Sequence, residues 1–476
     1  MTLLSASAQP ELNLLGNSDG ITASPGGENA AENLTIRKIQ IRLLPFLFVL
    51  YVIAFVDRIN IGFAALTMNK ELAITNQQFG FAAGIFFFGY CLFEVPSNLL
   101  LHKIGARIWI ARILITWGIL AALTGLVHTI HQLYVLRFLL GLAEAGYFPG
   151  IVLYLTYWLR QRERAQAVAL FLTGLPVTSI VGAPISGLIL DHTHWLGVSS
   201  WRWLLILEGL PAIVGGILAY VVLPNRPAEA KFLTTEEKER LHADLLREER
   251  KKLEQRHYSV LQALLDRRVL CLGVIEFGIL IGSYTFSFWV PQLIKLVSGQ
   301  SSNTAVGILV MIPYLVGAVA MVLVSRSSDR RLERRYHTGV PVLLGGIALL
   351  LIGAFHSPFT LIALLSLLAI GVYSWCGPFF ALPCEFLTGS AAAAGIALIN
   401  SIGNLGGFVG PYAIGAISGW TGGIFGGFAL MGIPMVLSAT GLLLLPKGAC
   451  VSGVASNYSS GLGTCADVKD RAGTSS

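Results

Sequence analysis

Twelve long runs of apolar residues constrain the fold of this chain more than any other feature of its sequence. A transmembrane α-helix needs about 20 consecutive apolar residues, and each run meets that length. Only 12% of the residues are charged, whereas soluble domains carry about 25%. We therefore predict an all-α integral membrane protein with twelve transmembrane helices. The predicted spans are residues 43–65, 78–100, 107–127, 132–154, 165–190, 203–223, 269–294, 304–325, 338–356, 358–381, 391–416 and 423–445.

The predicted spans fall into two sets of six, separated by the most highly charged stretch of the chain. This stretch contains eleven basic and nine acidic residues, and it shows no pattern typical of nucleic-acid binding. Two bundles joined by a linker are common among transporters. The predicted organisation is a polar tail (1–36), a six-helix bundle (37–223), a charged linker (224–268), a second six-helix bundle (269–446) and a second polar tail (447–476).

Basic residues in the short loops predict the orientation, because cytoplasmic loops are enriched in Lys and Arg. If the N-terminus is cytoplasmic, the loops and span ends on that side carry fifteen basic residues, and the opposite side carries Lys70, Arg202 and Lys295. This excess of fifteen basic residues over three predicts that both termini and the linker are cytoplasmic. Residues 1–35 are polar, so we expect no cleavable signal peptide.

Four charged residues deep inside the predicted spans are the first candidates for function. They are the two cations Arg58 and Arg137 and the two acids Asp57 and Glu144. A charge near the bilayer centre costs at least about 2.5–3.5 kcal/mol on insertion scales, so each one needs a partner or a watery cavity. The alternative to a functional role is a set of internal salt bridges that only hold helices together.

Three further acids lie within the spans. We favour a structural role for Glu94 and Glu208, which lie near span ends, and leave the role of Glu276 open.

The fourth span has the most informative spacing. Arg137 and Glu144 are seven residues apart, so on a continuous helix they share one face at a separation of about 10 Å. An arginine grips a carboxylate with a planar fork, and a carboxyl group in a poorly solvated cavity can take up and release a proton. Asp57 and Arg58 offer the same two chemistries, and Asp57 could instead balance Arg137 across the bundle.

The remaining polar side chains inside the spans are few. Tyr90, Tyr284, Asn400 and Asn404 could line a pocket, although an amide in a membrane helix often only joins two helices. We find no catalytic motif and no nucleotide-binding fingerprint in a suitable context, and the six cysteines show no metal-ligand spacing. We therefore predict neither an enzyme nor a cofactor or metal site, and expect an ion gradient to supply the energy for transport.

Several segments resemble the major facilitator superfamily, and in particular its anion:cation symporter branch. The loop after the second span, residues 98–107, lacks the Gly and Asp of the superfamily's usual pattern, and its variation is typical of that branch. The corresponding loop after the eighth span keeps Asp329 and Arg330. The segments that carry the resemblance are Asp57–Asn60, Phe93–Asn98, Arg137–Gly150 and Asn404–Pro411.

This resemblance implies a fold of two six-helix bundles and the import of a small organic anion with protons by alternating access. It implies substrate binding by Arg58, Arg137 and Tyr90, to which we add Asn404. It implies proton coupling by Glu144 and Asp57. We expect Asp329 and Arg330 to act in gating at the cytoplasmic mouth. The resemblance is strongest to bacterial carriers, so we expect a monomeric protein of the bacterial inner membrane.

The substrate is the most open part of this hypothesis. The first half resembles tartrate transporters and their aromatic-acid relatives, so we expect tartrate first and aromatic or aldonic acids as alternatives. Sugar-acid carriers often have a Gln where this chain reads Gly174-Leu175-Pro176, which weakens the aldonic-acid alternative. The rival hypotheses are a passive organic-anion facilitator, which would need no buried titratable pair, and a membrane enzyme, which would need a catalytic constellation.

Overall fold

The computed structural model of the chain describes residues 25–254, 260–299, 301–355, 357–387 and 389–445. The polar tails predicted from the sequence therefore lie largely outside the described residues. Within the described residues all regular secondary structure is helical, as the apolar runs predict.

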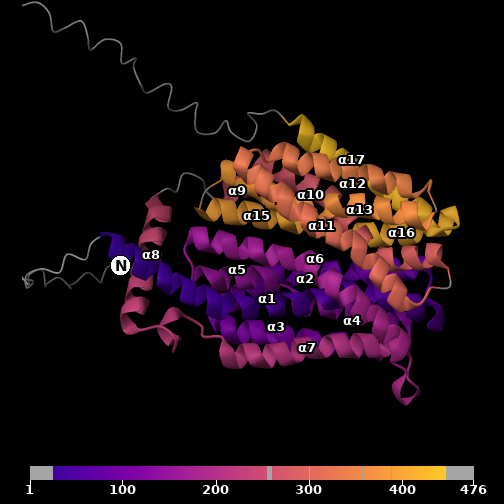
Figure 1. Cartoon of the computed structure of the whole chain (residues 1–476), viewed down its shortest axis with the longest axis horizontal. Coiled ribbons are helices and arrows are strands. Elements are labelled where there is room, and N and C mark those ends of the chain that lie inside the picture. The colour runs from indigo at the N-terminus through magenta and orange to yellow at the C-terminus, as the bar shows by residue number, and fades with distance from the viewer. Residues whose placement is uncertain (1–24, 255–259, 300, 356, 388, 446–476) are drawn as a thin grey trace, which may run out of the picture.

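The helices divide into two halves that lie side by side (Figure 1). The N-terminal half contains α1 (Pro25–Glu71), α2 (Asn76–Ile104), α3 (Ala106–Thr124), α4 (Ile130–Glu144), α5 (Tyr147–Thr156), α6 (Gln161–His192) and α7 (Ser200–Val222). The C-terminal half contains α9 (Val260–Leu265), α10 (Arg267–Ser298), α11 (Asn303–Arg331), α12 (Arg335–Ile352), α13 (Pro358–Ser374), α14 (Cys376–Ala381), α15 (Gly389–Asn404), α16 (Gly406–Thr421) and α17 (Ile424–Leu444).

Ten segments in the described part of the chain are helical, long and apolar enough to cross a membrane. They correspond to ten of the twelve predicted spans. The other two predicted spans, 78–100 and 391–416, lie on α2 and on α15 with α16, outside these ten. The helical membrane fold is thus confirmed, and the count of twelve stays a prediction.

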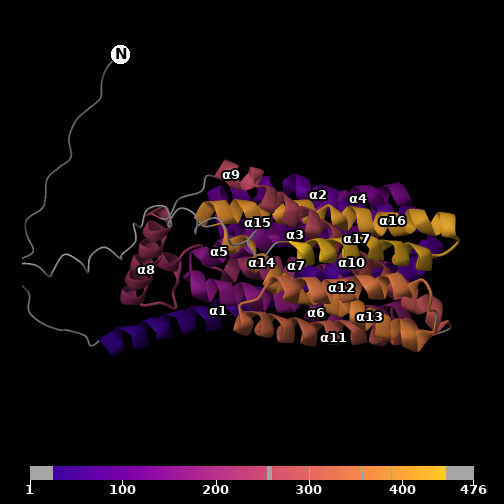
Figure 2. The same ribbon diagram turned by 90° about the horizontal axis from the view of Figure 1, so that it is seen from above.

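Helix α8 (Thr235–Glu254) lies across one end of the two halves, in the charged linker (Figures 1 and 2). Lys38 of α1 donates to Glu237 of α8 at 2.5 Å, and Arg164 of α6 lies 3.8 Å from Glu248 of α8. These contacts attach α8 to the N-terminal half. We call this end of the molecule the α8 end, and the opposite end, where α1 stops at Glu71 and α11 begins at Asn303, the far end.

One of the predicted spans, the fourth, is interrupted. α4 gives way to α5 at Ala145 and Gly146, and Gly146 has a φ of 82°, a left-handed conformation that glycine adopts without strain. At the boundaries between α13 and α14 and between α15 and α16, Trp375 and Leu405 keep right-handed helical backbone angles, so the chain continues there without a break. Irregular backbone within a membrane is tolerated only where protein or a cavity surrounds it, so we expect the α4–α5 break to lie inside the molecule.

Close backbone contacts join the two halves at the far end. α6 packs against α11 and α2 packs against α16. Glycines make these contacts possible, since an added Cβ at Gly80 would overlap the Pro411 carbonyl and one at Gly307 would overlap the Ala183 carbonyl. Gly187 and Gly415 meet Asn303 and Asn76 in the same way. We call this set of contacts the far-end seal.

A carboxylate completes the far-end seal. Asp191, near the end of α6, accepts hydrogen bonds from the backbone N–H groups of Asn303 at 3.1 Å and Thr304 at 2.7 Å. It also accepts from the Asn303 amide at 2.8 Å and the Thr304 hydroxyl at 2.7 Å. Residue Asp191 of one half therefore caps the N-terminus of a helix in the other half, where an anion is favoured.

Candidate functional site

An ion pair between α1 and α4 lies at the centre of the N-terminal half. The Arg58 guanidinium donates to Glu144, and both side chains are largely buried, with exposed fractions of 11% and 4%. Three aromatic rings surround the guanidinium, and its Cζ lies 4.7 Å from the ring centre of Phe55, 5.4 Å from that of Phe86 and 5.3 Å from that of Tyr90. The rings exclude water from the pair and add cation–π attraction.

The second buried arginine lies near this pair but bonds elsewhere. Arg137 donates through Nε to the Ala82 carbonyl at 3.3 Å, and its Cζ lies 5.1 Å from the ring centre of Phe86. Its Nη2 is buried and has no hydrogen-bond partner among the described residues. Arg137 is close enough to Glu144 for an electrostatic interaction. The sequence spacing predicts that Glu144 lies beside Arg137, whereas in the structure the side chain that bonds to Glu144 is Arg58.

Asp57 lies in a separate polar cluster of the N-terminal half. It is 1% exposed and accepts a hydrogen bond from the Asn60 amide at 3.1 Å. Asn60 also bonds to Glu208 of α7, and Glu208 accepts from the Ser186 hydroxyl at 2.7 Å. Asp57 is also within electrostatic reach of Arg137, as one of the sequence-based alternatives suggested. Asp57 and its neighbour Arg58 therefore do not form a pair.

A cavity of about 120 Å³ lies between the two halves beside Arg58. This volume is small compared with the roughly 300–1,000 Å³ of sites that hold drug-sized ligands. Both halves contribute to its wall, which combines aromatic rings with hydroxyl groups. Its lining includes Phe55, Arg58, Thr178, Tyr284, Tyr373 and Trp375.

Polar groups of the C-terminal half lie at this cavity or contact its wall. The Tyr284 hydroxyl donates to the Asn404 side-chain oxygen at 3.2 Å, where α15 ends. The indole nitrogen of Trp375, at the α13–α14 boundary, is buried and lacks a partner among the described residues. Asn404 thus contacts a residue that lines the cavity, and Trp375 supplies a free donor at its wall.

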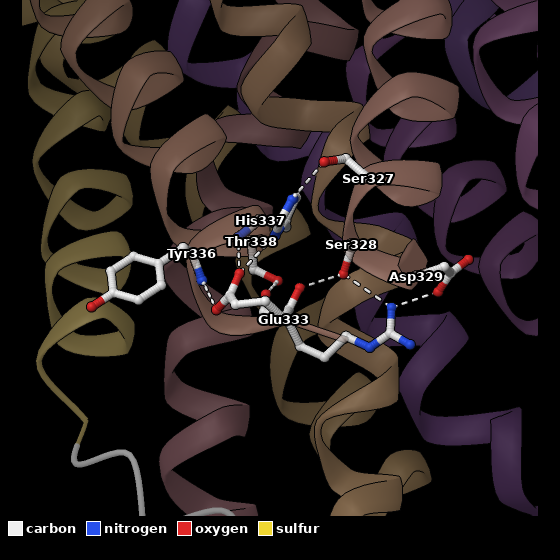
Figure 3. Close-up of polar contacts among 8 residues, drawn as sticks. Ser327, Ser328, Asp329, Glu333, Tyr336, His337 and Thr338 are labelled. Atoms are coloured by element: carbon white, nitrogen blue, oxygen red, sulfur yellow. Dashed lines mark hydrogen bonds and ion pairs between the residues drawn. The ribbon is translucent and has the colours of Figure 1, made fainter. Parts of the chain in front are cut away.

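The predicted gating residues Asp329 and Arg330 do not line this cavity and lie in the last turn of α11. Asp329 pairs at 2.5 Å with Arg334, which directly precedes α12, and is mostly exposed (Figure 3). Arg330 is also exposed. Although partial burial acts in the opposite direction, hydrogen bonds from the backbone N–H groups of Tyr336 and His337 lower the pKa of Glu333. The loop between α11 and α12 is therefore firmly attached to the start of α12.

Sequence reasoning found the charged residues of the site and several polar ones, but it missed Phe55, Phe86 and Asn60. Phe55, Phe86 and Asn60 contact the charged groups directly. Asn60 lies three residues after Asp57, a spacing that puts both on one helix face, so its bond to Asp57 could have been predicted. Phe55 and Phe86 could not be singled out in this way, because 10% of the residues in the chain are aromatic.

The sequence model of the Major Facilitator Superfamily matches residues 47–411. The chain belongs to the major facilitator superfamily. It is accordingly a multi-pass membrane transporter and not an enzyme.

Individual relatives agree with this assignment. A protein of Agrobacterium vitis named "Putative tartrate transporter" is 44% identical over 422 residues, which cover 89% of this chain and 97% of the relative. A "Quinolone resistance transporter" of Acinetobacter baumannii is 39% identical, with 87% and 94% covered. The solved structure of a bacterial homologue of the human lysosomal transporter Spinster, inward-facing and occupied, has a TM-score of 0.65 at 16% identity and covers 84% of this chain and 94% of that one. At that identity the likeness shows the fold alone.

Proposed function

We propose that this major facilitator imports a small organic carboxylate together with protons by alternating access, with tartrate as the first candidate substrate. Arg58 and Arg137 bind the carboxylate, Tyr90 and Asn404 contribute to the site, and Glu144 and Asp57 carry the coupled protons. The observation that carries the proposal is the buried ion pair between Arg58 and Glu144, with Arg137 within electrostatic reach.

The chemistry of coupling follows from competition for Arg58. When Glu144 is ionised it occupies the guanidinium, and a substrate carboxylate has to displace it. Protonation of Glu144 removes its negative charge and leaves Arg58 free for the substrate. Substrate and proton then favour each other's binding, and by linkage the effect is mutual. A membrane potential that is negative inside opposes the entry of an anion by about 2.3 kcal/mol per charge at 100 mV. Protons that enter with the anion offset this cost.

The direction of transport rests on the predicted topology. If the termini are cytoplasmic, the α8 end faces the cytoplasm and the far end faces the outside. The far-end seal then corresponds to a state closed to the outside, from which substrate leaves inwards. We place the protein in the bacterial inner membrane as a monomer on the strength of its similarity to bacterial carriers.

The size and chemistry of the cavity support a small anionic substrate. Its volume of about 120 Å³ suits a compact dicarboxylate better than a large molecule. The name of the Agrobacterium vitis relative points to tartrate, while the name of the Acinetobacter baumannii relative points to a quinolone, which is an aromatic compound that carries a carboxylate. The shared chemistry is a carboxylate, so both compounds and an aldonic acid belong in the substrate panel.

The test uses purified protein in proteoliposomes and the variant Glu144→Gln, which mimics the protonated acid. Wild-type protein should accumulate tartrate when the outside is acidic. Glu144→Gln should still bind tartrate and exchange it for labelled tartrate inside, but should lose uptake driven by the pH gradient. Glu236→Gln, on α8, is the matched control and should behave as wild type.

The affinity for tartrate adds a quantitative test. If one proton is linked to binding, the wild-type affinity falls at most about tenfold per pH unit as the pH rises, because one pH unit is worth about 1.36 kcal/mol. Calorimetric titration of Glu144→Gln should show little change between about pH 6 and pH 8. Accumulation of tartrate by this variant on a pH gradient would transfer the coupling role to Asp57. Uptake by wild type without any response to pH would instead indicate a passive facilitator.

A further inference from the structure

One buried acid of the C-terminal half has no part in the site described above. Glu276 of α10 is 1% exposed, and its Oε2 has no hydrogen-bond partner among the described residues. Nor does it make an ion pair with any Lys or Arg in the part of the chain that the structure describes. Burying an ionised carboxylate without a partner is very unfavourable, so the position of this side chain needs an explanation.

The packing around Glu276 makes room for its carboxyl group. A Cβ added to Gly403 of α15 would lie 2.7 Å from Cγ and 2.8 Å from Cδ of Glu276, so only a glycine fits opposite this side chain. Gly403 directly precedes Asn404, where α15 ends and which bonds to Tyr284. Glu276 therefore packs against the end of α15, next to a residue that contacts the cavity wall.

A second buried carboxyl group, in the other half, lies within electrostatic reach of Glu276. Glu94 of α2 is 7% exposed, and its Oε2 also lacks a partner among the described residues. The two acids are close enough to interact electrostatically. Both lie on the α8 side of the contact between the Phe87 and Tyr284 rings, whose centres are 4.3 Å apart. Glu94 follows Phe87 by seven residues, and Glu276 precedes Tyr284 by eight.

We propose that Glu94 and Glu276 form a second proton-binding site, shared between the two halves of the transporter and separate from Glu144 and Asp57. Two buried carboxyl groups that interact in this way resist ionising together, because a negative charge on one disfavours a negative charge on the other in a poorly solvated environment. In the present arrangement the pair holds at least one proton. When the halves separate at the α8 end, water reaches both groups and the proton leaves.

The titratable groups around this pair include one cation, which is engaged elsewhere. Tyr284 and Cys376 are neighbours of Glu276 in its own half, and Tyr90 and Cys91 are neighbours of Glu94. The cation is Arg58, which interacts with Glu94 but is already paired with Glu144. The pair therefore binds its proton without an ion pair to arginine, unlike Glu144.

This inference rests on the proposed proton coupling, and its test separates the two. In proteoliposomes, the tartrate gradient that just balances a fixed pH gradient gives the number of protons moved with each tartrate. One proton fewer lowers the maximal accumulation about tenfold for each unit of pH gradient. Glu276→Gln should transport tartrate with one proton fewer than wild type, Glu276→Asp should keep the wild-type ratio, and Glu385→Gln, an exposed acid of the same half, should also keep it. An unchanged ratio in Glu276→Gln would overturn the proposal.

A second measurement needs no transport at all. The infrared spectrum of purified wild-type protein near neutral pH should contain the carbonyl band of a protonated carboxylic acid that is missing in Glu276→Gln. If Glu276→Gln does not insert correctly, Glu94→Gln should change the same band, because the proton is shared. An identical band in wild type and in both variants would overturn the site. Failure of wild type to respond to pH in transport, with the band still present, would overturn the proposed function and leave the site standing.

Discussion

The far-end seal allows a sharp prediction, because one side chain carries most of its hydrogen bonds. Asp191 of the N-terminal half accepts four hydrogen bonds from Asn303 and Thr304 at the start of α11. The side chain of Ser302 already caps this helix by accepting from Ala305. Removing Asp191 should therefore weaken the contact between the halves without unwinding α11.

The size of the effect can be worked out from the bonds that are lost. Replacing a capping Asp by Ala costs about 0.5–2 kcal/mol, and the charge at the helix N-terminus contributes about 0.3–1 kcal/mol more. Asp191→Ala should thus destabilise the closed far end by about 2 kcal/mol, which shifts the ratio of open to closed molecules roughly thirtyfold. Asp191→Asn keeps an acceptor and should shift the ratio roughly fivefold, or about 1 kcal/mol.

Distances between spin labels measure this shift directly. Labels at His194 and Ser301, in loops of the two halves at the far end, would be introduced after replacement of the six native cysteines. The long-distance population should increase in Asp191→Ala and less in Asp191→Asn. Asp244→Ala, which removes a carboxylate of α8 that pairs with Arg247 of the same helix, should change nothing. If Asp191→Ala gives the same distance distribution as wild type, Asp191 does not hold the seal.

Two further predictions concern residues identified from the sequence. Arg58→Lys and Arg137→Lys should each reduce tartrate uptake by at least about tenfold, because a point charge cannot replace the planar fork of arginine. Near-normal uptake by Arg137→Lys would show that bidentate binding by Arg137 is not required. Near-normal uptake by Arg137→Gln would show that Arg137 does not bind the anion. Asp329→Asn should favour the state open at the α8 end and slow uptake several-fold while tartrate binding persists; unchanged uptake kinetics would limit the loop to a role in topology.

The sequence predicted the parts of this protein that depend on one helix at a time. Apolar length alone identified the ten confirmed spans, because water cannot satisfy backbone groups inside a membrane. The cost of buried charge singled out Arg58 and Glu144. Their contact with each other could not be predicted, since it joins α1 to α4 and depends on how the two helices pack.

Local signals predicted the interruption of the fourth span only in part. Gly146 could mark an interruption because glycine readily adopts a positive φ. The predicted spacing of Arg137 and Glu144 assumed a continuous helix, which the structure ends at Glu144. Glu276 illustrates the same limit, because its meaning depends on Glu94, which lies in the other half of the chain.

The break between α4 and α5 has a mechanical consequence at the α8 end. α5 has 10 residues and is therefore about 15 Å long. A tilt of about 15° at Gly146 would move its free end by about 4 Å, roughly the width of a side chain. α5 is therefore a short lever, and its tilt would reshape the α8 end while the glycine contacts of the far end stay in place.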